Sequence, residues 1–264
     1  MQTDPSAKTI YLILTDKDTE ETLLHYELIR SAVADKGRVK LLFHQKGSVV
    51  SGRILSTDPY LFTHQSLLML NYLSIADPLI PTNAHFPLLE FYLNYPVYDY
   101  YWLIEDDVQF SGDWSVLFEA FQNDGHDFIT THIRYHEEEP LWTWWRPFGH
   151  LTENIPDQRR LRSFNPIYRI SRSALGFIHN ALLQFWIGHH EVLYPTLLHE
   201  NGFRIMDMGG DGRFVPEGFR NVFYTSRSSC SEGCIEEGTF RFRPCWEKIG
   251  NENNKLYHPV KQKI

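Results

Sequence analysis

Blocks of apolar residues separated by polar residues predict a β-α-β order at the start of the chain. Residues 9–16, TIYLILTD, form an apolar run with a polar end, and residues 38–46 form a second such run, so we expect two strands. Between them, residues 20–35 show helical spacing after a cap at Asp18 or Thr19. The residues expected on the buried stripe of this helix are Leu23, Leu24, Leu28, Ile29 and Val33. A strand, a helix and a strand in this order imply a parallel sheet with a helical crossover.

The pattern continues to about residue 133 and then becomes less regular. Further strands are expected at residues 60–64, 100–104, 127–133, 163–170 and 203–210. Further helices are expected at residues 66–80, at 84–96, at 112–124 with Asp113 as cap, after a cap at Ser171 or Ser173, and within 189–202 with a stop at Gly202. Residues 136–161 are too irregular for a helix and too aromatic for a linker. The predicted fold class is α/β, with a mostly parallel sheet flanked by helices and a loop-rich C-terminal part.

Composition limits the classes of partner. The 264 residues suit one large domain or one domain with a sub-lobe, and 42% hydrophobic residues supply a sizeable core. Aromatic residues make up 15%, which suggests that some rings line a groove for a flat or sugar-like ligand. The net charge of −8 counts against nucleic acid, but a divalent cation would still allow a small phosphorylated ligand.

The chain contains no apolar run long enough for a spanning helix, and its start lacks the features of a signal peptide. We therefore expect a cytoplasmic protein. The odd number of cysteines fits that expectation, because Cys230, Cys234 and Cys245 have no framework spacing. Free thiols are the simpler interpretation, and half of a metal site at Cys230 and Cys234 is the alternative.

Three adjacent carboxylates follow the apolar aromatic run YYWLI of residues 100–104. Glu105 and Asp107 share a face if the strand continues, and Asp106 points the other way. Hard divalent cations such as Mg²⁺ and Mn²⁺ take oxygen ligands from one or two carboxylates and from substrate phosphates. The alternative is a solvated acidic turn that caps the next helix. The apolar lead-in disfavours it, because a cap needs only one carboxylate.

The stretch YWLIEDDVQFSGDW, after two β-α units, resembles the GT-A glycosyltransferases and is similar to bacterial glycosyltransferase-like proteins. Such enzymes hold a nucleotide-sugar diphosphate through a divalent ion, here Mn²⁺ or Mg²⁺. The resemblance spans roughly residues 8–261. It implies a single domain, with a nucleotide-sugar-binding half at about 8–133 and an acceptor-binding half at about 134–264.

Several members of that superfamily supply a distant histidine as a further metal ligand. In this chain LYHPVK offers His258, beside Pro259, and an imidazole favours Mn²⁺. A surface histidine is the alternative. The resemblance also implies that Thr15 and Asp16, after the first strand, and Phe62 and Thr63, after the third, contact the base and ribose, with Asp106 also at the donor. Asp16 is equally well explained as a helix-entry cap. Lys261 or Arg227 would neutralise the leaving diphosphate.

An inverting transfer needs a general base for the acceptor hydroxyl. Glu191, at the start of the helix within 189–202, is the candidate, and many inverting GT-A enzymes carry an acidic residue on the corresponding helix. A first-turn carboxylate that favours the helix dipole is the alternative. The loop PLWTWWRPF offers Trp144 and Trp145 for stacking on an acceptor sugar, or else as a hydrophobic plug. Asn165 is a candidate for an acceptor hydroxyl.

The predicted activity is metal-dependent transfer of a sugar from a nucleotide-diphosphate sugar to a glycan or lipid-linked acceptor, the latter with possible peripheral membrane association. The first alternative is a metal-dependent hydrolase or phosphotransferase, which would need further acidic ligands such as Asp127 and Asp207. The second is a non-catalytic sugar-binding protein with structural calcium. No nucleic acid partner is expected.

Overall fold

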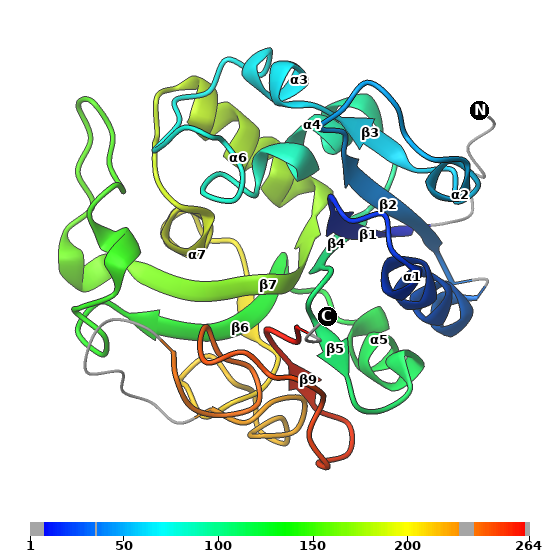
Figure 1. Ribbon diagram of the computed structural model, residues 1–264. Coiled ribbons are helices and arrows are strands. Elements are labelled where there is room, and N and C mark those ends of the chain that lie inside the picture. Colours follow the sequence, from blue (N-terminus) through cyan, green and yellow to red (C-terminus); the bar gives the residue numbers. More distant parts are fainter. Residues whose placement is uncertain (1–7, 35, 227–234, 262–264) are drawn as a thin grey trace.

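A seven-stranded sheet forms the centre of the molecule (Figure 1). The computed structural model describes residues 8–34, 36–226 and 235–261. The sheet order is β3-β2-β1-β4-β7-β6-β8, and β7 runs against the other six strands. The strands are β1 (Thr9–Thr15), β2 (Arg38–His44), β3 (Tyr60–Phe62), β4 (Tyr100–Glu105), β6 (Phe128–Tyr135), β7 (Leu161–Ser171) and β8 (Ile205–Asp207). The predicted α/β class with a mostly parallel sheet is confirmed.

Helices cover both faces of this sheet (Figure 1). Helices α1 (Glu20–Val33) and α5 (Trp114–Gln122) pack together on one face. On the other face lie α4 (Phe86–Asn94), α6 (Arg172–Leu183) and α7 (His190–Glu200). Short elements complete the fold: α2 (Gly52–Leu55), α3 (His64–Leu68) and the 3-10 turns Thr143–Trp145 and Asp157–Arg159. Because β4 is covered on both sides, Trp102 contacts Phe118 of α5 while Tyr101 contacts Phe91 of α4. This two-sided burial explains the continuous apolar run before the acidic residues.

The buried face of α1 differs from the predicted stripe. Thr19 caps the helix as expected, but Leu24 and Leu28 are 62% and 49% exposed. The core face instead consists of Thr22, His25, Tyr26, Ile29 and Val33. Packing against the sheet and α5 fixes the helix rotation, and it selects His25 and Tyr26 over two leucines.

The helix predicted at residues 66–80 is largely wrong. Helix α3 ends at Leu68, and Asn71 takes a left-handed conformation with φ 58°, which stops a helix. The loop that follows is held by Asn83, whose side-chain N–H groups donate to the carbonyl oxygens of Ala76 and Leu79. The other predicted helices and strands are present, with bounds that differ by a few residues.

A second, two-stranded sheet was not predicted. Strand β5 (Gln109–Phe110) pairs antiparallel with β9 (Leu256–Tyr257) near the C-terminus. Otherwise, residues 208–226 and 235–261 form loops, turns and isolated bridges, which agrees with the loop-rich C-terminal part that the sequence predicted. Among the described residues, no helix is both long and apolar enough to cross a membrane.

Candidate active site

The acidic residues lie at the carboxyl end of β4, where the strand order reverses. Strand β1 pairs with β2 on one side and with β4 on the other, so the gap between the ends of β1 and β4 is a topological switch point. Ligands of open α/β sheets bind at such points. Glu105 is the last residue of β4, and a turn closed by the bond from the Val108 N–H to the Glu105 carbonyl oxygen, 3.1 Å, carries Asp106 and Asp107. The expected alternation is therefore replaced by a turn, which still brings Glu105 and Asp107 together.

The β5–β9 pairing brings His258 to these carboxylates across about 150 positions of sequence. Gln109 faces Tyr257 in the register, so continuing the ladder by one residue places Val108 opposite His258. The Val260 N–H also donates to the Asp107 carbonyl oxygen at 2.8 Å. Secondary structure, rather than chance proximity, therefore fixes the position of the imidazole.

Glu105, Asp107 and His258 each offer one ligand atom, and these three atoms lie within 4.8 Å of one another. The His258 Nε2 atom is 3.3 Å from Asp107 Oδ1 and 3.8 Å from Glu105 Oε2. The His258 Nδ1 atom lies 2.8 Å from the Arg241 carbonyl oxygen and is thus assigned as the N–H donor. That assignment directs the Nε2 lone pair at the carboxylates, as in metal-ligating histidines whose second nitrogen donates to a carbonyl.

The charges of the cluster are incompletely compensated. Although burial opposes it, the neighbouring imidazole of His258 holds the pKa of Asp107 below its usual range. Burial, together with the charges of Asp107 and Glu191, raises the pKa of Glu105 well above its usual range. Two carboxylates in one partly buried space therefore favour either a proton or a cation between them.

The donor set fits a divalent metal. The Asp107 Oδ1 atom is buried and accepts no hydrogen bond of good geometry from the described residues. Two carboxylates and one imidazole give oxygen and nitrogen donors, a combination better suited to Mn²⁺ than to Mg²⁺. The three residues expected as metal ligands are thus together, and a metal would satisfy the free carboxylate oxygen.

Asp106 points toward β1, away from the metal-binding candidates. Its Oδ2 atom accepts from the Thr15 hydroxyl at 2.6 Å, and its Oδ1 atom accepts from Lys17 Nζ at 2.8 Å. Lys17 was not identified from the sequence, because a lysine after a strand carries no distinguishing signal. Asp16 forms an ion pair with Lys46. Lys17 and Lys46 thus lie beside Asp106 and Asp16, the two carboxylates expected at the donor site.

The other residues expected at the donor site differ in whether their side chains already have a structural role. Thr63 caps α3, and its hydroxyl accepts from the Ser66 N–H at 3.0 Å, so its side chain has a structural partner already. Phe62 is buried. Lys261 is half-exposed, with Nζ 3.7 Å from Asp107 Oδ2. Arg227, like Cys230 and Cys234, lies outside the described residues.

Glu191 lies in the first turn of α7 and is 5% exposed. Its Oε2 atom is buried without a hydrogen bond among the described residues, and it is 3.5 Å from His189 Nδ1. Burial raises the pKa of Glu191 to about 8. A carboxyl group with a free oxygen and a pKa shifted toward neutrality has the properties of an acid–base catalyst.

Aromatic and imidazole rings surround Glu191. Trp144 stacks on His189 with ring centroids 4.2 Å apart, and His189 lies 4.6 Å from His190. His190 in turn stacks on His85 at 5.6 Å. Burial holds the pKa of His85, His189 and His190 below the usual range, so these rings are neutral. The sequence analysis missed His85, since no motif distinguishes it.

Two of the residues expected at the acceptor site are buried side chains. Trp145 is 5% exposed, and its indole N–H donates to the Glu139 carbonyl oxygen at 2.9 Å, which fits the hydrophobic-plug alternative. Asn165 is 1% exposed. Its amide oxygen accepts from the Thr130 hydroxyl at 2.7 Å, and its amide N–H donates to the His190 carbonyl oxygen at 3.1 Å. Asn165 therefore fastens the start of α7 to the sheet and has no free face for an acceptor.

The extra acidic ligands required by the hydrolase alternative are not at this cluster. Asp127 accepts from the Ser171 hydroxyl and from the Arg204 N–H. Asp207 is fully buried and accepts from Tyr224. Among the described residues, Glu105, Asp107 and His258 are the one group with metal-site spacing.

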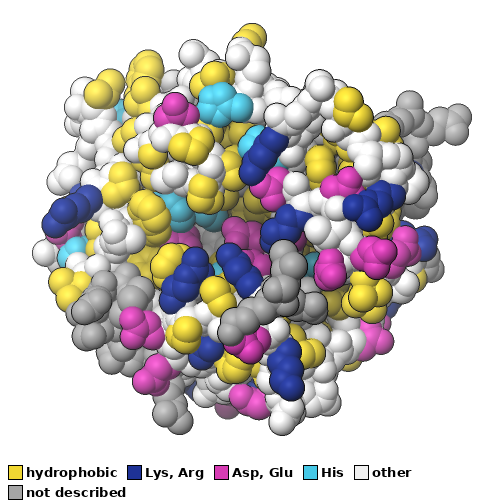
Figure 2. Space-filling view, viewed as in Figure 1, with side chains coloured by type: hydrophobic (Ala, Val, Ile, Leu, Met, Phe, Trp, Pro, Cys, Tyr) yellow, Lys and Arg dark blue, Asp and Glu magenta, His cyan; other side chains and the backbone are white. Residues whose placement is uncertain are grey.

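Figure 2 shows a hollow near the centre of one face, among β4, β7, α7 and the C-terminal segment of Figure 1. Acidic and histidine side chains gather inside the hollow, and Lys and Arg side chains lie around its rim. An acidic floor with a cationic rim suits a metal bound to a phosphorylated ligand.

No protein-family model matches this chain, and no curated protein matches it. In structure it is similar to a glycosyltransferase involved in glycosylation of the major capsid of PBCV-1, with 7% identity, 75% of this chain and 81% of that chain covered, and a TM-score of 0.35. It is also similar to glucosyl-3-phosphoglycerate synthase from Mycobacterium tuberculosis in complex with Mn²⁺, uridine diphosphate and phosphoglyceric acid, with 12% identity, 64% and 57% covered, and a TM-score of 0.38.

A third similar structure is a putative glucose-1-phosphate thymidylyltransferase from Bacillus anthracis in complex with sucrose, with 12% identity, 77% and 87% covered, and a TM-score of 0.38.

Proposed function

We propose that this protein is a metal-dependent glycosyltransferase that moves a sugar from a nucleotide-diphosphate sugar to a glycan or lipid-linked acceptor. The observation that carries the proposal is the cluster of Glu105, Asp107 and His258 at the switch point of the sheet, with ligand atoms within 4.8 Å of one another. The buried Asp107 Oδ1 atom, which accepts no hydrogen bond of good geometry from the described residues, supports a cation there.

Glu105, Asp107 and His258 would hold Mn²⁺, or Mg²⁺, which when bound supplies positive charge for the diphosphate of the donor. Lys17 and Lys261, which already lie near Asp106 and Asp107, would add cationic charge at the same place. With a cation bound to Asp107, Lys261 would be available to phosphate oxygens, whereas Lys17 would keep its bond to Asp106, which lies outside the metal-ligand set. This arrangement favours departure of the nucleoside diphosphate.

The nucleoside would lie over the ends of β1 and β3, beside Thr15, Asp16, Thr63 and Asp106. Carboxylates at this position would accept hydrogen bonds from ribose hydroxyls or a base N–H group. Asp16 is the more accessible of the two because its side chain is about one-third exposed, against 15% for Asp106. The Lys46 ion pair would have to open or shift for direct contact.

Glu191 would act as the general base. Its carboxylate takes the proton of the acceptor hydroxyl while the acceptor oxygen forms a bond to the anomeric carbon. The bond from that carbon to the diphosphate oxygen breaks, and its electron pair leaves with the nucleoside diphosphate. Attack from the opposite face gives inversion. Trp144, stacked on His189 beside Glu191, would form one wall for the acceptor sugar.

The direct test is a thermal-shift and calorimetric panel of uridine, guanosine and cytidine nucleotides, with and without Mn²⁺. We expect stabilisation by one nucleoside diphosphate that depends on the metal, because a ligand that binds only the folded state raises its stability. Asp107→Asn should remove this effect. The matched control is Asp99→Asn, because Asp99 precedes the same strand at its other end and is half-exposed.

Two other results would argue against the proposed function. Stabilisation by Ca²⁺ alone, with no response to any nucleotide, would support a non-catalytic sugar-binding protein. Binding without any transfer from a panel of nucleotide sugars to oligosaccharide or polyprenyl-phosphate acceptors would contradict the transferase proposal.

A further inference from the structure

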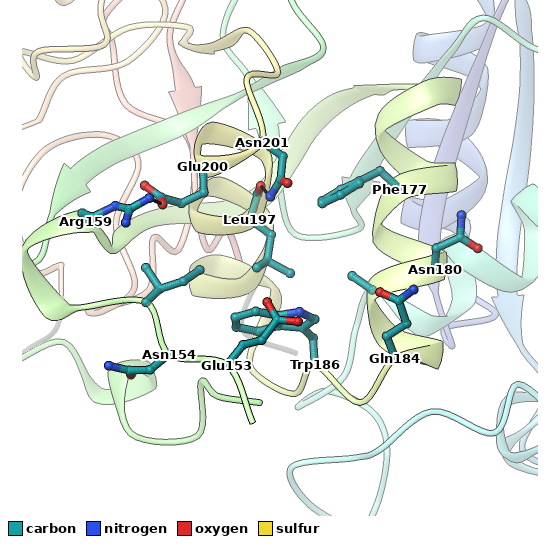
Figure 3. Close-up of a pocket in the computed structure, with 12 residues that line it drawn as sticks. Glu153, Asn154, Arg159, Phe177, Asn180, Gln184, Trp186, Leu197, Glu200 and Asn201 are labelled. Atoms are coloured by element: carbon teal, nitrogen blue, oxygen red, sulfur yellow. Dashed lines mark hydrogen bonds and ion pairs between the residues drawn. The ribbon is translucent and has the colours of Figure 1, made fainter. Parts of the chain in front are cut away.

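A second cavity, of about 480 Å³, lies between α6, α7 and the loop at residues 153–159. Figure 3 shows Asn180 and Gln184 on one side and Leu197 and Glu200 on the other, with Trp186 between them at the base. The cavity opens at the C-terminal end of α7, whereas Glu191 lies in the first turn of the same helix. At about 1.5 Å per residue, those two ends of α7 are roughly 15 Å apart along its axis. The cavity is therefore distinct from the candidate active site.

Four carboxamide side chains line this cavity, and one of them, Asn201, donates to the Leu197 carbonyl oxygen at 2.8 Å. The side chains of Asn154, Asn180 and Gln184 line it and form no hydrogen bond within the described part of the chain. Each amide offers both donors and an acceptor, which is the combination that sugar hydroxyl groups require.

Trp186 adds an indole N–H donor and a packed aromatic ring. The side chain is 7% exposed, and its ring is packed by Phe148 at 5.5 Å and by His150 at 5.0 Å. Its indole N–H has no acceptor among the described residues, and the nitrogen is not one of the fully buried atoms. It is therefore available as a donor to a ligand oxygen.

The charge of the cavity favours a neutral ligand. Arg159 is ion-paired with Glu200, and Glu153 is the remaining charged residue in the lining. No unpaired cation is therefore available for a phosphate or carboxylate. Ile155, Phe177 and Leu197 supply apolar contact for the C–H surfaces of a sugar ring. This lining suits neither a nucleotide nor an acidic saccharide.

The chain connects this cavity closely to the candidate active site. Trp186 precedes His189 by three residues, so their Cα atoms are at most about 11 Å apart. Gly149 and Ile187 exchange two backbone hydrogen bonds of 2.9 Å, which fasten the loop carrying Trp144 to the same segment. One extended ligand with several sugar units would span both places.

We propose that this cavity is a binding site for a neutral saccharide unit, separate from the metal cluster, and that it holds a distal part of the glycan acceptor. The role in acceptor binding rests on the proposed glycosyltransferase function, whereas the saccharide site itself does not. A distal site of this kind would make acceptor affinity increase with oligosaccharide length.

The test is ¹⁹F NMR of the full chain labelled with 5-fluorotryptophan, in EDTA and without nucleotide, with the Trp186 resonance assigned from Trp186→Phe. The probes are maltotetraose, cellotetraose, chitotetraose and mannotetraose, with tetragalacturonate as the acidic comparison. We expect at least one neutral probe to shift the Trp186 resonance. Asn180→Ala/Gln184→Ala should weaken that binding at least tenfold and retain the spectrum of a folded protein.

The matched control is Gln122→Ala, because Gln122 is also an exposed glutamine at a helix end but lies on α5. It should bind as the unmodified protein does, and so should Asp107→Asn. Three results would overturn the saccharide site. They are no shift of the Trp186 resonance with any neutral probe, an equal response to tetragalacturonate, and unchanged binding in the double variant. Saccharide binding in a protein without transferase activity would instead refute the proposed function and leave the site intact.

Discussion

The backbone N–H of Val260 donates to the Asp107 carbonyl oxygen at 2.8 Å, and it thereby ties the C-terminal segment to the turn after β4. His258 is two residues from this bond, with Nε2 3.3 Å from Asp107 Oδ1. Metal affinity should therefore depend on C-terminal packing as well as on the ligands themselves.

The ligand residues give the first prediction. Asp107→Asn should abolish turnover with little loss of fold, because the amide keeps the size of the side chain but loses its charge. His258→Ala should weaken Mn²⁺ binding about 10–100-fold and reduce the preference for Mn²⁺ over Mg²⁺. Calorimetric titration with each metal measures both effects. Unchanged Mn²⁺ affinity in both variants would refute the assigned site.

The pairing of β9 gives a second prediction. Leu256 is fully buried and pairs with Phe110, so Leu256→Ala should lower the free energy of unfolding by about 2–5 kcal/mol. It should also weaken Mn²⁺ binding, because β9 sets the position of His258. Denaturant unfolding and metal titration measure the two losses. A destabilised variant with normal metal affinity would show that His258 is positioned independently of β9.

Glu191 gives a prediction about catalysis. Glu191→Gln should lower turnover by about 10²–10⁴-fold, since an amide cannot accept the proton of the acceptor hydroxyl. Nucleotide binding should be unchanged, because Glu191 is not one of the three ligand candidates. Single-turnover assays and nucleotide titration separate these effects. Full activity in this variant would exclude Glu191 as the base.

The pH dependence of stability follows from the same residue. Burial raises the pKa of Glu191 from an ordinary value of 4.5 to about 8 in the folded protein. Its contribution to stability is thus complete below pH 4.5 and is lost as the pH rises toward 8. Without metal, we expect Glu191→Gln to be more stable than the unmodified protein at pH 8 by about 1–3 kcal/mol, with no such gain at pH 4.5. Unfolding curves at the two pH values measure the difference, and an equal gain at both would contradict it.

Substitution of Trp144 tests the proposed acceptor-binding site. It packs face to face on His189 and is only partly buried, so Trp144→Ala should raise the KM for the acceptor with a smaller change in the KM for the donor. Trp145→Ala is the informative comparison. Trp145 is buried, and its indole N–H donates to the Glu139 carbonyl oxygen. Its loss should therefore chiefly lower the free energy of unfolding, by about 3–5 kcal/mol. Equal effects of both changes on acceptor KM would argue against a wall formed by Trp144.

The sequence by itself determined the alternation of strands and helices and the location of Glu105 and Asp107 at a strand end. These follow from local periodicity and from caps such as Thr19 and Asp113, which neighbouring residues decide. The sequence also singled out His258, but only through its resemblance to glycosyltransferases. Its actual approach to Asp107 depends on the pairing of β5 with β9 across about 150 positions of sequence.

Only the tertiary structure decided which side of each element is used. It turned His25 and Tyr26 of α1 inward, buried Trp145 and Asn165, and set Lys17 against Asp106. It also formed the cavity at Trp186 from two helices and a loop, none of which carries a local motif for it. The physical reason is that burial and long-range pairing depend on the packing of distant segments, and local periodicity contains no information about that packing.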